Sequence, residues 1–540
     1  PVIMQIKAYG GFVMKKANGA LWPLTCLILI LSLSFYPAPL TATAATSTPS
    51  SPSSSYPLGP DLSQFPPGYN PLTGLPVSDP SWLELPAVLV SLSNFPPSVR
   101  PQTGLSFAPQ VYEIYITEGM TRFLAVFYGE PPQSVPTTTD LNPRAEPLRI
   151  TGPALGNRVW WDQNADALQQ PWEAGLGGIE IQLLDLRGNV VQSALSDDNG
   201  YYAVVPPSES QYRLRIQIPN GFTLTQANAG DDSADSDADP RTGQTELITF
   251  EKTDLTLDFG LIWNTLASTS STNANPSLSG IEHPQDAGLA GVRSGREAYV
   301  PIANAFPNGC LVAASKSADV NLRICRNVFG SNPQDINSAG LSVNQLRALA
   351  EANRNPQSPP NYSGNAFDPQ PPSGGQPATQ INVFYAYLNQ ARWIYDPVAQ
   401  AYWRYQDFGT ESQVGKFAPA TDRLTDRPLL FENIVILFVE HTARRPTIID
   451  LNMGPGSKGR AIVFRNGQVY TNLVWSMVSE DYEKTTSLAR PVRLRYPDGR
   501  PFPLAPGQTW FHIATPGSTL RQEAQPDTWK FRFYPPVGAK

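Results

Sequence analysis

The sequence predicts a mainly β protein with some α-structure. Prolines number 55 among the 540 residues, about twice the usual share, and a proline inside a helix costs about 3 kcal/mol. Alternating apolar residues, separated by turn sequences, recur in the middle of the chain and predict short strands. The length and the hydrophobic content of 41% suffice for about two to four domains, which excludes a wholly disordered chain. The formal charge of −7 excludes a generally basic nucleic-acid-binding protein.

The N-terminal part of the chain predicts a secretory signal peptide over residues 14–44. Met14 and two lysines precede an apolar run over 24–35, and the small residues Ala42-Thr-Ala44 follow it. A retained membrane anchor is the alternative, but the apolar run is shorter than the roughly 20 residues that span a bilayer. We therefore expect a secreted, envelope-associated protein with no stable transmembrane span once the signal is cleaved.

Two polar stretches predict linkers. Residues 45–69 consist almost entirely of Ser, Thr, Pro, Gly and Tyr, a composition that cannot bury enough apolar surface to fold and that prolines keep extended. Residues 265–280 form a second run of Ser, Thr and Asn. The first linker is expected to hold the folded part of the chain away from the envelope.

Residues 153–264 predict an antiparallel β-sandwich. Ile179, Ile181 and Leu183 alternate with polar residues, and the same period of two recurs over 212–218 and 255–261. Turn sequences such as Asp-Asn-Gly and Pro-Asn-Gly separate these runs. Short alternating strands at this spacing are typical of a sandwich of two sheets.

The acidic residues of this block predict calcium binding. Oxygen ligands fall at loop positions 1, 3, 5, 7 and 12, the spacing of an EF-hand-type loop, where position 7 uses its backbone carbonyl. The predicted ligands of this first loop are Asp162, Asn164, Asp166, Leu168 and Glu173.

A second acidic run extends the calcium prediction. Its carboxylates repel one another unless a cation neutralises them; the residues are Asp231, Asp232, Asp235, Asp237 and Asp239. The alternative is a solvated acidic loop without metal. In the first loop, Ala167 stands where an EF-hand loop has glycine for its sharp turn, which is expected to reduce affinity.

The block resembles a known family of modules. The segments GNRVWWDQNADALQQPWEAGLGGIEIQLLD, DDNGYYAV, GDDSADSDADP and TDLTLDFGLI are similar, in this order, to the SD-repeat protein B domain, a Cna-B-like module of bacterial surface proteins. The resemblance implies a prealbumin-like β-sandwich that calcium stabilises and that serves as a spacer or adhesion unit. Many Cna-B relatives contain a Lys–Asn isopeptide bond. Lys252 is the only lysine of this block and the first strand has none, so we expect no such bond.

The flanking segments resemble a second family. The motifs RPQTGL, VYEIYITEGMTRFLAVF, GVRSGREAYV, IYDPVAQAYWRY, GSKGRAIVFRNGQV and PGQTWFHI are similar, in this order, to the YerB-like lipoproteins, an envelope family of unknown function. In that family the FLAVF segment runs almost directly into the GVRSGR segment, so the sandwich is expected to be an insertion into an α+β host of two sub-domains. The resemblance implies an N-terminal domain in two parts, 70–130 and 281–378, and a C-terminal domain over 381–518. No convincing lipobox is present, and residues 325–378 match the family weakly.

Some elements of the host follow from local sequence. Ser342 and Gln345 predict a capping box that begins a helix. Asn466-Gly467 predicts a hairpin turn between two strands. Aromatic residues over 384–403 predict a paired aromatic hairpin. A platform on which nucleic-acid bases stack is the alternative for these rings, but no basic stripe surrounds them, so we expect no nucleic-acid partner.

Three short host motifs combine arginine, glutamate and glycine. Arginine's planar fork suits phosphate or carboxylate, and glycine lets a ligand approach the backbone closely. The candidate residues are Arg100, Glu113, Glu118, Arg122, Arg293 and Arg296. One interpretation is a binding site for an anionic cell-wall or extracellular ligand of unknown identity. The alternatives are an internal network of Arg–Glu pairs, or an envelope hydrolase or transferase that acts at this cluster. No G-x-S-x-G or H-E-x-x-H motif supports a standard hydrolase, and no catalytic residue is assigned.

Two cysteines, Cys310 and Cys325, lie beyond the predicted signal peptide. In an exported protein an even pair predicts a disulfide, which contributes about 3 kcal/mol for a loop of this length. Two buried free thiols are the alternative. The three histidines are far apart in sequence and show no metal-ligand spacing, so calcium is the only cofactor expected.

Overall fold

The computed structural model describes most of the chain beyond the first linker. Its described residues are 56–132, 150, 152–162, 165–170, 173, 175–219, 222–263, 288–330, 338–408, 415–425 and 427–539. The predicted signal peptide, most of the first linker, the second linker and Asn164 lie outside the described residues. Strands dominate what is described, which confirms the prediction of a mainly β protein.

The helices are short and belong to the host. The α-helices are α1 (Val300–Asn304), α2 (Val343–Ala352) and α3 (Asp481–Thr486). The 3₁₀ turns are η1 (Leu62–Gln64), η2 (Pro80–Glu84), η3 (Pro97–Val99), η4 (Leu105–Phe107) and η6 (Glu297–Tyr299). The capping box at α2 is confirmed, because Ser342 Oγ accepts from Gln345 N at 3.2 Å and Gln345 Oε1 accepts from Ser342 N at 2.9 Å. Among the described helices, none has the length and apolar character needed to cross a membrane.

One eleven-stranded sheet forms the centre of the host. Its order is β18-β17-β3-β5-β4-β36-β29-β32-β33-β21, and β34 pairs with β33. The strands are β18 (Arg326–Asn327), β17 (Cys310–Ala313), β3 (Val88–Ser93), β5 (Met120–Phe127), β4 (Gln110–Thr117), β36 (Thr509–Ala514), β29 (Asn433–Phe438), β32 (Lys458–Arg465), β33 (Gln468–Ser476), β21 (Gln376–Pro377) and β34 (Arg493–Arg495). Strands from the two ends of the chain meet where β4 and β36 pair in parallel. The predicted hairpin turn is confirmed, since Arg465 pairs with Gln468 across Asn466-Gly467.

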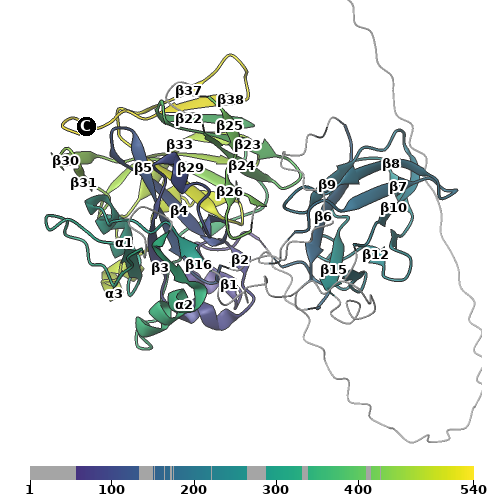
Figure 1. Ribbon diagram of the computed structural model, residues 1–540, viewed down its shortest axis with the longest axis horizontal. Helices are drawn as coiled ribbons and strands as arrows, with labels where there is room; N and C mark the ends of the chain where they lie inside the picture. The colour runs from purple at the N-terminus through teal and green to yellow at the C-terminus, as the bar shows by residue number, and fades with distance from the viewer. Residues whose placement is uncertain are drawn as a thin grey trace, which may run out of the picture. The chain divides into compact units, whose positions relative to one another are not determined.

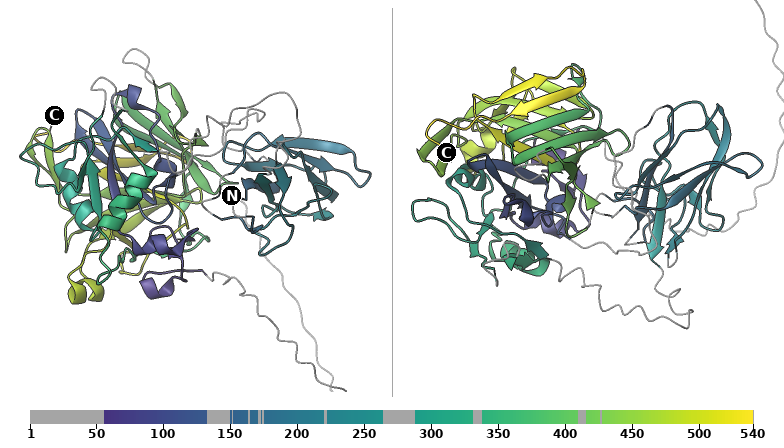
Figure 2. Two further views of the ribbon diagram at one scale, coloured as in Figure 1. Left: turned by 60° about the horizontal axis from the view of Figure 1, so that its bottom comes forward. Right: turned by 45° about the horizontal axis from the view of Figure 1, so that its top comes forward.

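A seven-stranded sheet is the second layer of the host (Figures 1 and 2). It consists of β25 (Phe417–Pro419), β24 (Ala401–Asp407), β23 (Asn389–Asp396), β22 (Gln380–Ala386), β38 (Thr528–Arg532), β37 (Thr519–Gln522) and β28 (Leu430–Phe431). The predicted aromatic hairpin is confirmed as β22–β23–β24. Trp393 and Tyr402 of this sheet and Phe123 and Trp510 of the central sheet belong to one buried core.

Short ribbons and connections complete the host. The two-stranded ribbons are β1 (Tyr69–Asn70) with β2 (Leu75–Pro76), β16 (Gly288–Ala290) with β19 (Gly340–Ser342), β20 (Ala366–Phe367) with β35 (Pro503–Leu504), β26 (Thr421–Asp422) with β27 (Arg427–Pro428), and β30 (His441–Arg445) with β31 (Ile448–Leu451). A second core covers the other face of the central sheet, where Tyr299, Ile302 and Phe306 pack over Leu89 and Leu311.

The inserted block is a two-sheet sandwich with a core of its own. One sheet has the order β12-β13-β10-β7-β8, with β14 beside β10; its strands are β12 (Ala238–Asp239), β13 (Gln244–Thr245), β10 (Ser210–Ile216), β7 (Glu180–Leu184), β8 (Val190–Leu195) and β14 (Ile248–Phe250). The other sheet consists of β11 (Phe222–Leu224), β15 (Phe259–Trp263), β6 (Leu155–Trp161) and β9 (Tyr201–Val204).

The sandwich differs from the prediction in three details. The pair β6–β15 is parallel rather than antiparallel. The last predicted run is a strand only from Phe259 onward, although Leu257 is buried. Ile218 is 40% exposed, because β10 ends at Ile216 and the chain has left the sheet. A prediction from alternation alone therefore makes a strand too long where the backbone turns out of the sheet.

Candidate functional site

The register of three chain segments brings two predicted arginines to one face of the central sheet. In the β3–β5 pair, Arg122 lies opposite Ser93. On the other side of β3, Val292 forms a bridge with Leu92, and Arg293 N donates to Ser91 O at 2.8 Å. Because side chains alternate with a period of two, Ser91, Ser93, Arg122 and Arg293 share one face. The FLAVF and GVRSGR motifs therefore meet across β3.

The side chain of Tyr299 lies at the centre of this group. Arg122 Nη1 donates to the backbone O and, at 2.8 Å, to the Oγ of Ser294, and the Arg122 guanidinium also bonds the Tyr299 hydroxyl. The Tyr299 hydroxyl is 3.1 Å from Ser91 Oγ. Arg296 comes directly before η6, and its buried Nε has no hydrogen-bond partner among the described residues. We call Arg122, Arg293 and Arg296 the arginine cluster.

Burial and the repulsion between like charges both disfavour the charged forms of Arg122 and Arg296 in the arginine cluster. Burial first, and then the neighbouring charges of Arg296 and Arg293, lower the pKa of the Arg122 guanidinium to about 10, against the opposing effect of Tyr299. The pKa of Arg296 is lowered by the same two causes, burial and then Arg293, against the opposing effect of Tyr299. Within the described part of the chain, none of the three arginines forms an ion pair with a carboxylate. Like charges held together without a counter-charge favour binding of an anion.

The other three members of the predicted set lie elsewhere. Glu113 is buried against Arg404 of β24 at 3.4 Å, and each side chain is 1% exposed. Arg100 is also buried and donates to Asn94 O and Asp407 O. Glu118 is exposed in the β4–β5 turn with φ +51°. The six predicted residues thus divide into the arginine cluster, two residues buried elsewhere (Glu113 and Arg100) and one turn residue (Glu118). The carboxylates that an enzymatic role would use are not at the arginine cluster.

Arg404 was not among the predicted residues, although the IYDPVAQAYWRY motif contains it. Its guanidinium lies over the rings of Trp510, Trp393 and Phe123, at 4.3, 5.1 and 5.4 Å from their centroids. Trp510 Nε1 also donates to Glu113 Oε2 at 3.2 Å. The ring contacts and this hydrogen bond stabilise the buried pair, so this part of the host carries its own counter-charge. The signal for Arg404 in the sequence was a charged residue within a run of aromatic residues that belong to the core.

In the sandwich, the two predicted acidic loops lie side by side. Leu168 of the first loop forms a bridge with Asp235 of the second. Asp162 and Asp235 are both buried. Asp162 Oδ2 accepts from Ala167 N at 3.0 Å and from Thr225 Oγ1 at 2.6 Å, and Asp235 Oδ2 accepts from Gly230 N at 2.7 Å. The Oδ1 of each of these carboxylates is buried with no hydrogen-bond partner among the described residues.

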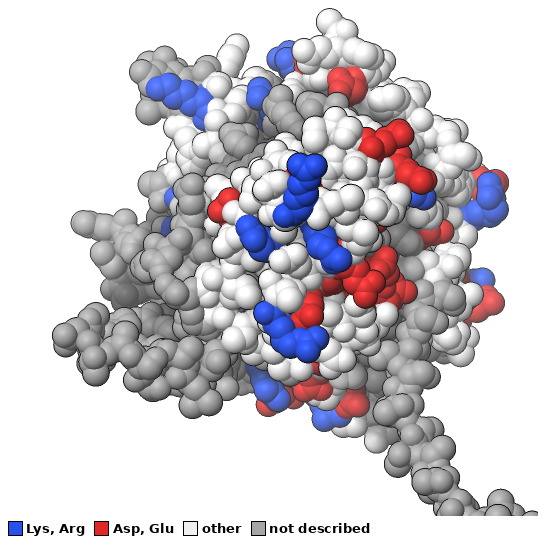
Figure 3. Space-filling model, turned by 90° about the vertical axis from the view of Figure 1, so that its right-hand side faces the viewer, with Lys and Arg blue, Asp and Glu red and all other residues white. Residues whose placement is uncertain are grey.

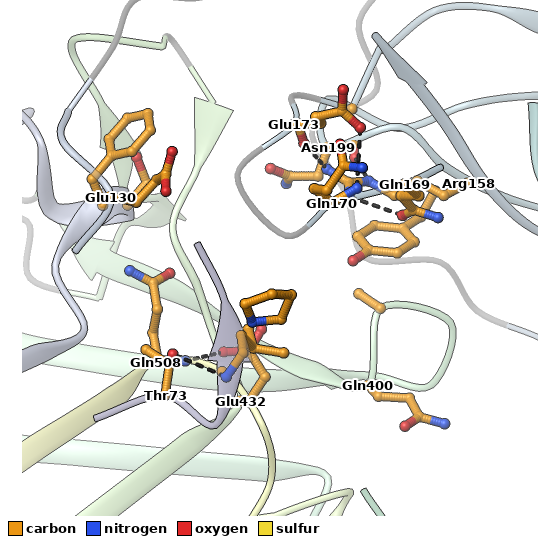
Figure 4. A pocket seen from close by; sticks show the side chains of 18 of the residues that line it. Thr73, Glu130, Arg158, Gln169, Gln170, Glu173, Asn199, Gln400, Glu432 and Gln508 are labelled. Carbon is orange, nitrogen blue, oxygen red and sulfur yellow. Dashed lines mark hydrogen bonds between the residues drawn. The ribbon is translucent and has the colours of Figure 1, made fainter. Parts of the chain in front are cut away.

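Glu173, the predicted last ligand of the first loop, is buried and held from two sides. Its Oε2 accepts from Gln170 N at 3.0 Å. Arg158 of β6 donates to Glu173 O at 2.9 Å and to Gln169 Oε1 at 3.0 Å, as Figure 4 shows. Ala167 has φ +65°, the left-handed conformation that glycine provides in an EF-hand loop. The loop therefore makes the expected turn despite the alanine.

The remaining acidic residues differ in burial. Asp237 is buried and accepts from Asp258 N, and burial, with a smaller effect of Asp232 and Asp235, raises its pKa to about 7. Asp258 is also buried with a strongly raised pKa, and the prediction missed it although the TDLTLDFGLI motif contains it. Four carboxylates make local contacts at more accessible positions: Asp166, Asp231, Asp232 and Asp239. Within the described residues, no three His, Cys, Asp or Glu side chains are close enough together to hold a metal ion.

Family models match three parts of the chain. The DUF3048 N-terminal domain matches residues 72–137, the SdrD B-like domain residues 153–261, and the DUF3048 C-terminal domain residues 381–511; both DUF3048 models describe proteins of unknown function. The chain carries both DUF3048 domains, one on each side of an SdrD B-like domain. The two resemblances inferred from the sequence motifs are confirmed.

Several staphylococcal proteins match part of the chain. The chain is 36% identical to the Fibrinogen-binding protein of Staphylococcus epidermidis over 86 residues, 16% of this chain and 8% of that protein. It is 30% identical over 141 residues to Serine-aspartate repeat-containing protein F of Staphylococcus epidermidis (26% of this chain, 8% of the relative) and 29% identical over 139 residues to Serine-aspartate repeat-containing protein D of Staphylococcus aureus (26% and 10%). The chain thus spans a tenth or less of these relatives.

Among solved structures, the YerB protein from Bacillus subtilis is similar to this chain. The sequence identity is 16% and the TM-score 0.42, with 83% of this chain and 96% of YerB covered. In the DUF3048 host, Arg122 lies within the matched N-terminal segment, whereas Arg293 and Arg296 follow the SdrD B-like domain in the chain. The arginine cluster therefore joins residues that the inserted domain separates by more than 160 positions in the sequence.

Proposed function

We propose that this protein acts at the bacterial cell surface, where the DUF3048 host binds an anionic ligand and a calcium-stabilised SdrD B-like domain serves as a spacer. The similarity to the SdrD B-like domain and to serine-aspartate repeat proteins supports the location. The observation that carries the binding function is the arginine cluster, three half-buried guanidinium groups near one tyrosine with no carboxylate paired to them in the described structure.

The donors around the arginine cluster favour a phosphoryl group over a single carboxylate. A planar carboxylate has two oxygens and is saturated by one bidentate arginine. Three guanidinium groups offer more donors than that, and Arg296 Nε is a buried donor without a partner in the described structure. A phosphoryl group supplies more acceptor oxygens and more negative charge. The cluster is therefore better suited to a phosphorylated ligand of the envelope.

Calcium is proposed for the two adjoining acidic loops of the SdrD B-like domain. The fit rests on the buried Oδ1 atoms of Asp162 and Asp235, which need a cation or a donor that the described residues do not provide. Calcium binds six to eight oxygen ligands, and the first loop would supply them from Asp162, Asn164, Asp166, Leu168 and Glu173. Asp235 and Asp237 are the corresponding residues of the second loop. Bound calcium would neutralise carboxylates that are now buried together and would tie the two loops to each other.

Isothermal titration of the full chain with inorganic phosphate tests the anion site. We expect the double variant Arg293→Ala/Arg296→Ala to lower phosphate affinity at least about ten-fold, because two guanidinium partners are lost. Arg347→Ala is the matched control, since Arg347 is an exposed helix residue whose partner is Glu351. Equal phosphate affinity in the double variant and the wild type would overturn the proposed site.

Calorimetry of the full chain with calcium or with a chelator tests the metal proposal. Calcium should raise the melting temperature of the transition that belongs to the SdrD B-like domain, since a ligand at 100 times its Kd stabilises by about 2.7 kcal/mol. Asp162→Asn should remove most of this increase. Glu209→Gln, an exposed carboxylate of the same domain, should leave it unchanged. Identical melting temperatures with calcium and with chelator would contradict the proposal.

A further inference from the structure

A loop closed by a disulfide lies directly beside the arginine cluster. Cys310 begins β17 in the central sheet and Cys325 lies near the end of the loop; the two form a disulfide with a Cα–Cα distance of 5.4 Å. Backbone hydrogen bonds join this loop to the GVRSGR segment: Ala314 N donates to Arg293 O at 2.9 Å, and Gly295 N donates to Ser315 O at 2.7 Å. We call residues 314–326 the disulfide loop.

Side-chain packing confirms how closely the disulfide loop approaches. A Cβ atom on Gly295 would come within 2.6 Å of Leu322 Cδ2. A Cβ at position 295 would force Leu322 to shift, so glycine lets Leu322 pack against the backbone between Arg293 and Arg296. Leu322 itself is buried in the host core, which fixes this end of the loop beside the backbone that carries Arg293 and Arg296.

The disulfide loop adds positive charge that the nearby acids do not cancel. Lys316, Arg323 and Arg326 are exposed and form no ion pair with the described residues, and Lys316 Nζ donates to Val320 O at 2.9 Å. The acids of this region are already occupied. Asp319 pairs with Arg445. Glu297 pairs with Arg444 at 2.9 Å and accepts from Asn321 N.

We propose that the disulfide loop is a second basic wall of the anion site, and that the ligand is a linear phosphodiester polymer whose neighbouring phosphates contact the arginine cluster and the loop together. The inference rests on the proposed function of the arginine cluster. A single phosphate can be bound by the arginine cluster alone, which leaves the three charges of the loop without a partner in the ligand. A chain of phosphodiesters places one negative charge on each repeat, so that charges beyond the first meet Lys316 and Arg323. Binding to both walls adds the energies of several weak contacts.

The disulfide fixes the position of the disulfide loop. Cys310 is fully buried in β17, which pairs with β3 beside the arginine cluster, whereas Cys325 is exposed at the end of the loop. Closing the loop removes conformations that the open loop would otherwise have to lose when the polymer binds. Reduction is therefore expected to weaken polymer binding more than binding of a single phosphate.

Titrations of the full chain with two probes test the inference. The probes are glycerol phosphate, which carries one phosphoryl group, and poly(glycerol phosphate), and the variants are Lys316→Ala/Arg323→Ala and Arg293→Ala/Arg296→Ala. The loop variant should bind the polymer about ten-fold more weakly, since each of two exposed charges contributes up to about 0.7 kcal/mol. The same variant should bind the monomer within about two-fold of wild type, and the arginine-cluster variant should lose both probes. Lys458→Ala, an exposed lysine of the β32 start, is the control.

The outcomes separate this inference from the proposed function. If the arginine-cluster variant binds the monomer as wild type does, the proposed function fails. If it loses the monomer but the loop variant binds the polymer as wild type does, the second wall fails and the first site stands. Equally tight binding of polyglutamate would overturn the choice of a phosphodiester. Mild reduction, verified by intact mass and by an unchanged circular dichroism spectrum, should weaken polymer binding several-fold. Cys310→Ser/Cys325→Ser repeats the test without a reductant, and unchanged polymer binding in both forms would overturn the role of the disulfide.

Discussion

The SdrD B-like domain and the DUF3048 host both bury charge, but of opposite sign. Residues 153–264 contain 17 Asp and Glu and 6 Lys and Arg, a balance of −11, and the remaining 29 acids and 33 bases give +4. In the domain, carboxylates such as Asp162 and Asp235 are buried with an oxygen that has no partner among the described residues. In the host, Arg122 and Arg296 are held together without an acid. Figure 3 shows one face of the molecule, on which acidic side chains gather next to basic ones. Each region is thus electrostatically incomplete in a way that a ligand of the opposite charge would correct.

The host also provides an internal contrast. Arg404 is more deeply buried than the arginine cluster, yet Glu113 and three aromatic rings compensate its charge. The burial of a charge therefore does not mark a site by itself. A buried charge that lacks a counter-charge in the folded chain is the feature that indicates a missing ligand.

The largest expected effect comes from breaking the compensated pair. Arg404→Met leaves Glu113 buried without its cation, so we expect the host to lose about 3 to 5 kcal/mol of unfolding free energy in denaturant titrations. The double variant Arg404→Met/Glu113→Gln should recover part of the loss, because no lone charge is left buried. Arg347→Met, at an exposed pair with Glu351, should cost less than about 0.5 kcal/mol. A similar small loss at Arg404 would mean that the pair is not the counter-charge described here.

The next effect concerns the uncompensated carboxylates. Burial raises the pKa of Asp237 to about 7 from its ordinary value of 3.8, so the folded domain binds this proton more tightly than the unfolded chain. Without calcium, the stability from this group is complete below about pH 3.8 and is lost as the pH rises through 7. Between pH 5 and pH 8 we expect the chelated domain to lose about 2 to 3 kcal/mol.

Thermal unfolding at several pH values measures this loss. Calcium should remove it, because a cation favours the ionised carboxylates. Asp237→Asn should make the profile of the chelated protein less steep, with Asp258 keeping part of the dependence, whereas Glu209→Gln should leave the profile unchanged. A chelated profile that is already flat in the wild type would show that these carboxylates are not strained by burial.

A third prediction concerns His512 in the compensated region. Trp393 Nε1 donates to His512 Nε2 at 3.2 Å, so the histidine proton lies on Nδ1, 3.4 Å from Glu113 Oε2. Burial, and then the charge of Arg404, lowers the pKa of His512 well below 6.5. The stability from neutral His512 is therefore present above about pH 6.5 and is lost as the pH falls below it, about 2 kcal/mol by pH 5. Denaturant titrations of His512→Gln should show a weaker dependence than the wild type, and the part that stays belongs to His441, whose pKa burial lowers to about 4. A wild-type profile that is flat between pH 7 and pH 5 would contradict the prediction.

The smallest effect tests the backbone of the first acidic loop. Ala165 is exposed and has φ +57°, a conformation that costs a non-glycine residue about 1 kcal/mol. Ala165→Gly should therefore stabilise the SdrD B-like domain by up to about 1 kcal/mol in calorimetry. Ala229→Gly, at an exposed position without positive φ, should destabilise it by a few tenths of a kcal/mol. Destabilisation by Ala165→Gly would show that the loop is not strained.

Local sequence predicted those features that neighbouring residues determine. The capping box of α2 needs only Ser342 and Gln345, and the Asn466-Gly467 turn needs only two residues that tolerate positive φ. The two domain resemblances could also be predicted from the sequence, because each rested on several motifs of many residues that follow one another in the family's order. Local sequence failed to predict where a strand ends, as at Ile218, because apolar and polar residues keep alternating along the sequence after the backbone has left the sheet.

The sequence by itself determined the strand-rich composition, the acidic character of the inserted block and the presence of arginines in three host motifs. Only the tertiary structure decided which of those arginines act together. The register of β3 with β5 and with the segment around Val292 placed Arg122 beside Arg293, while the parallel pairing of β4 with β36 placed Glu113 next to His512 and inside a core shared with Arg404. Partners for a charge are set by contacts between distant segments, and a local motif carries no information on whether its charge will be compensated.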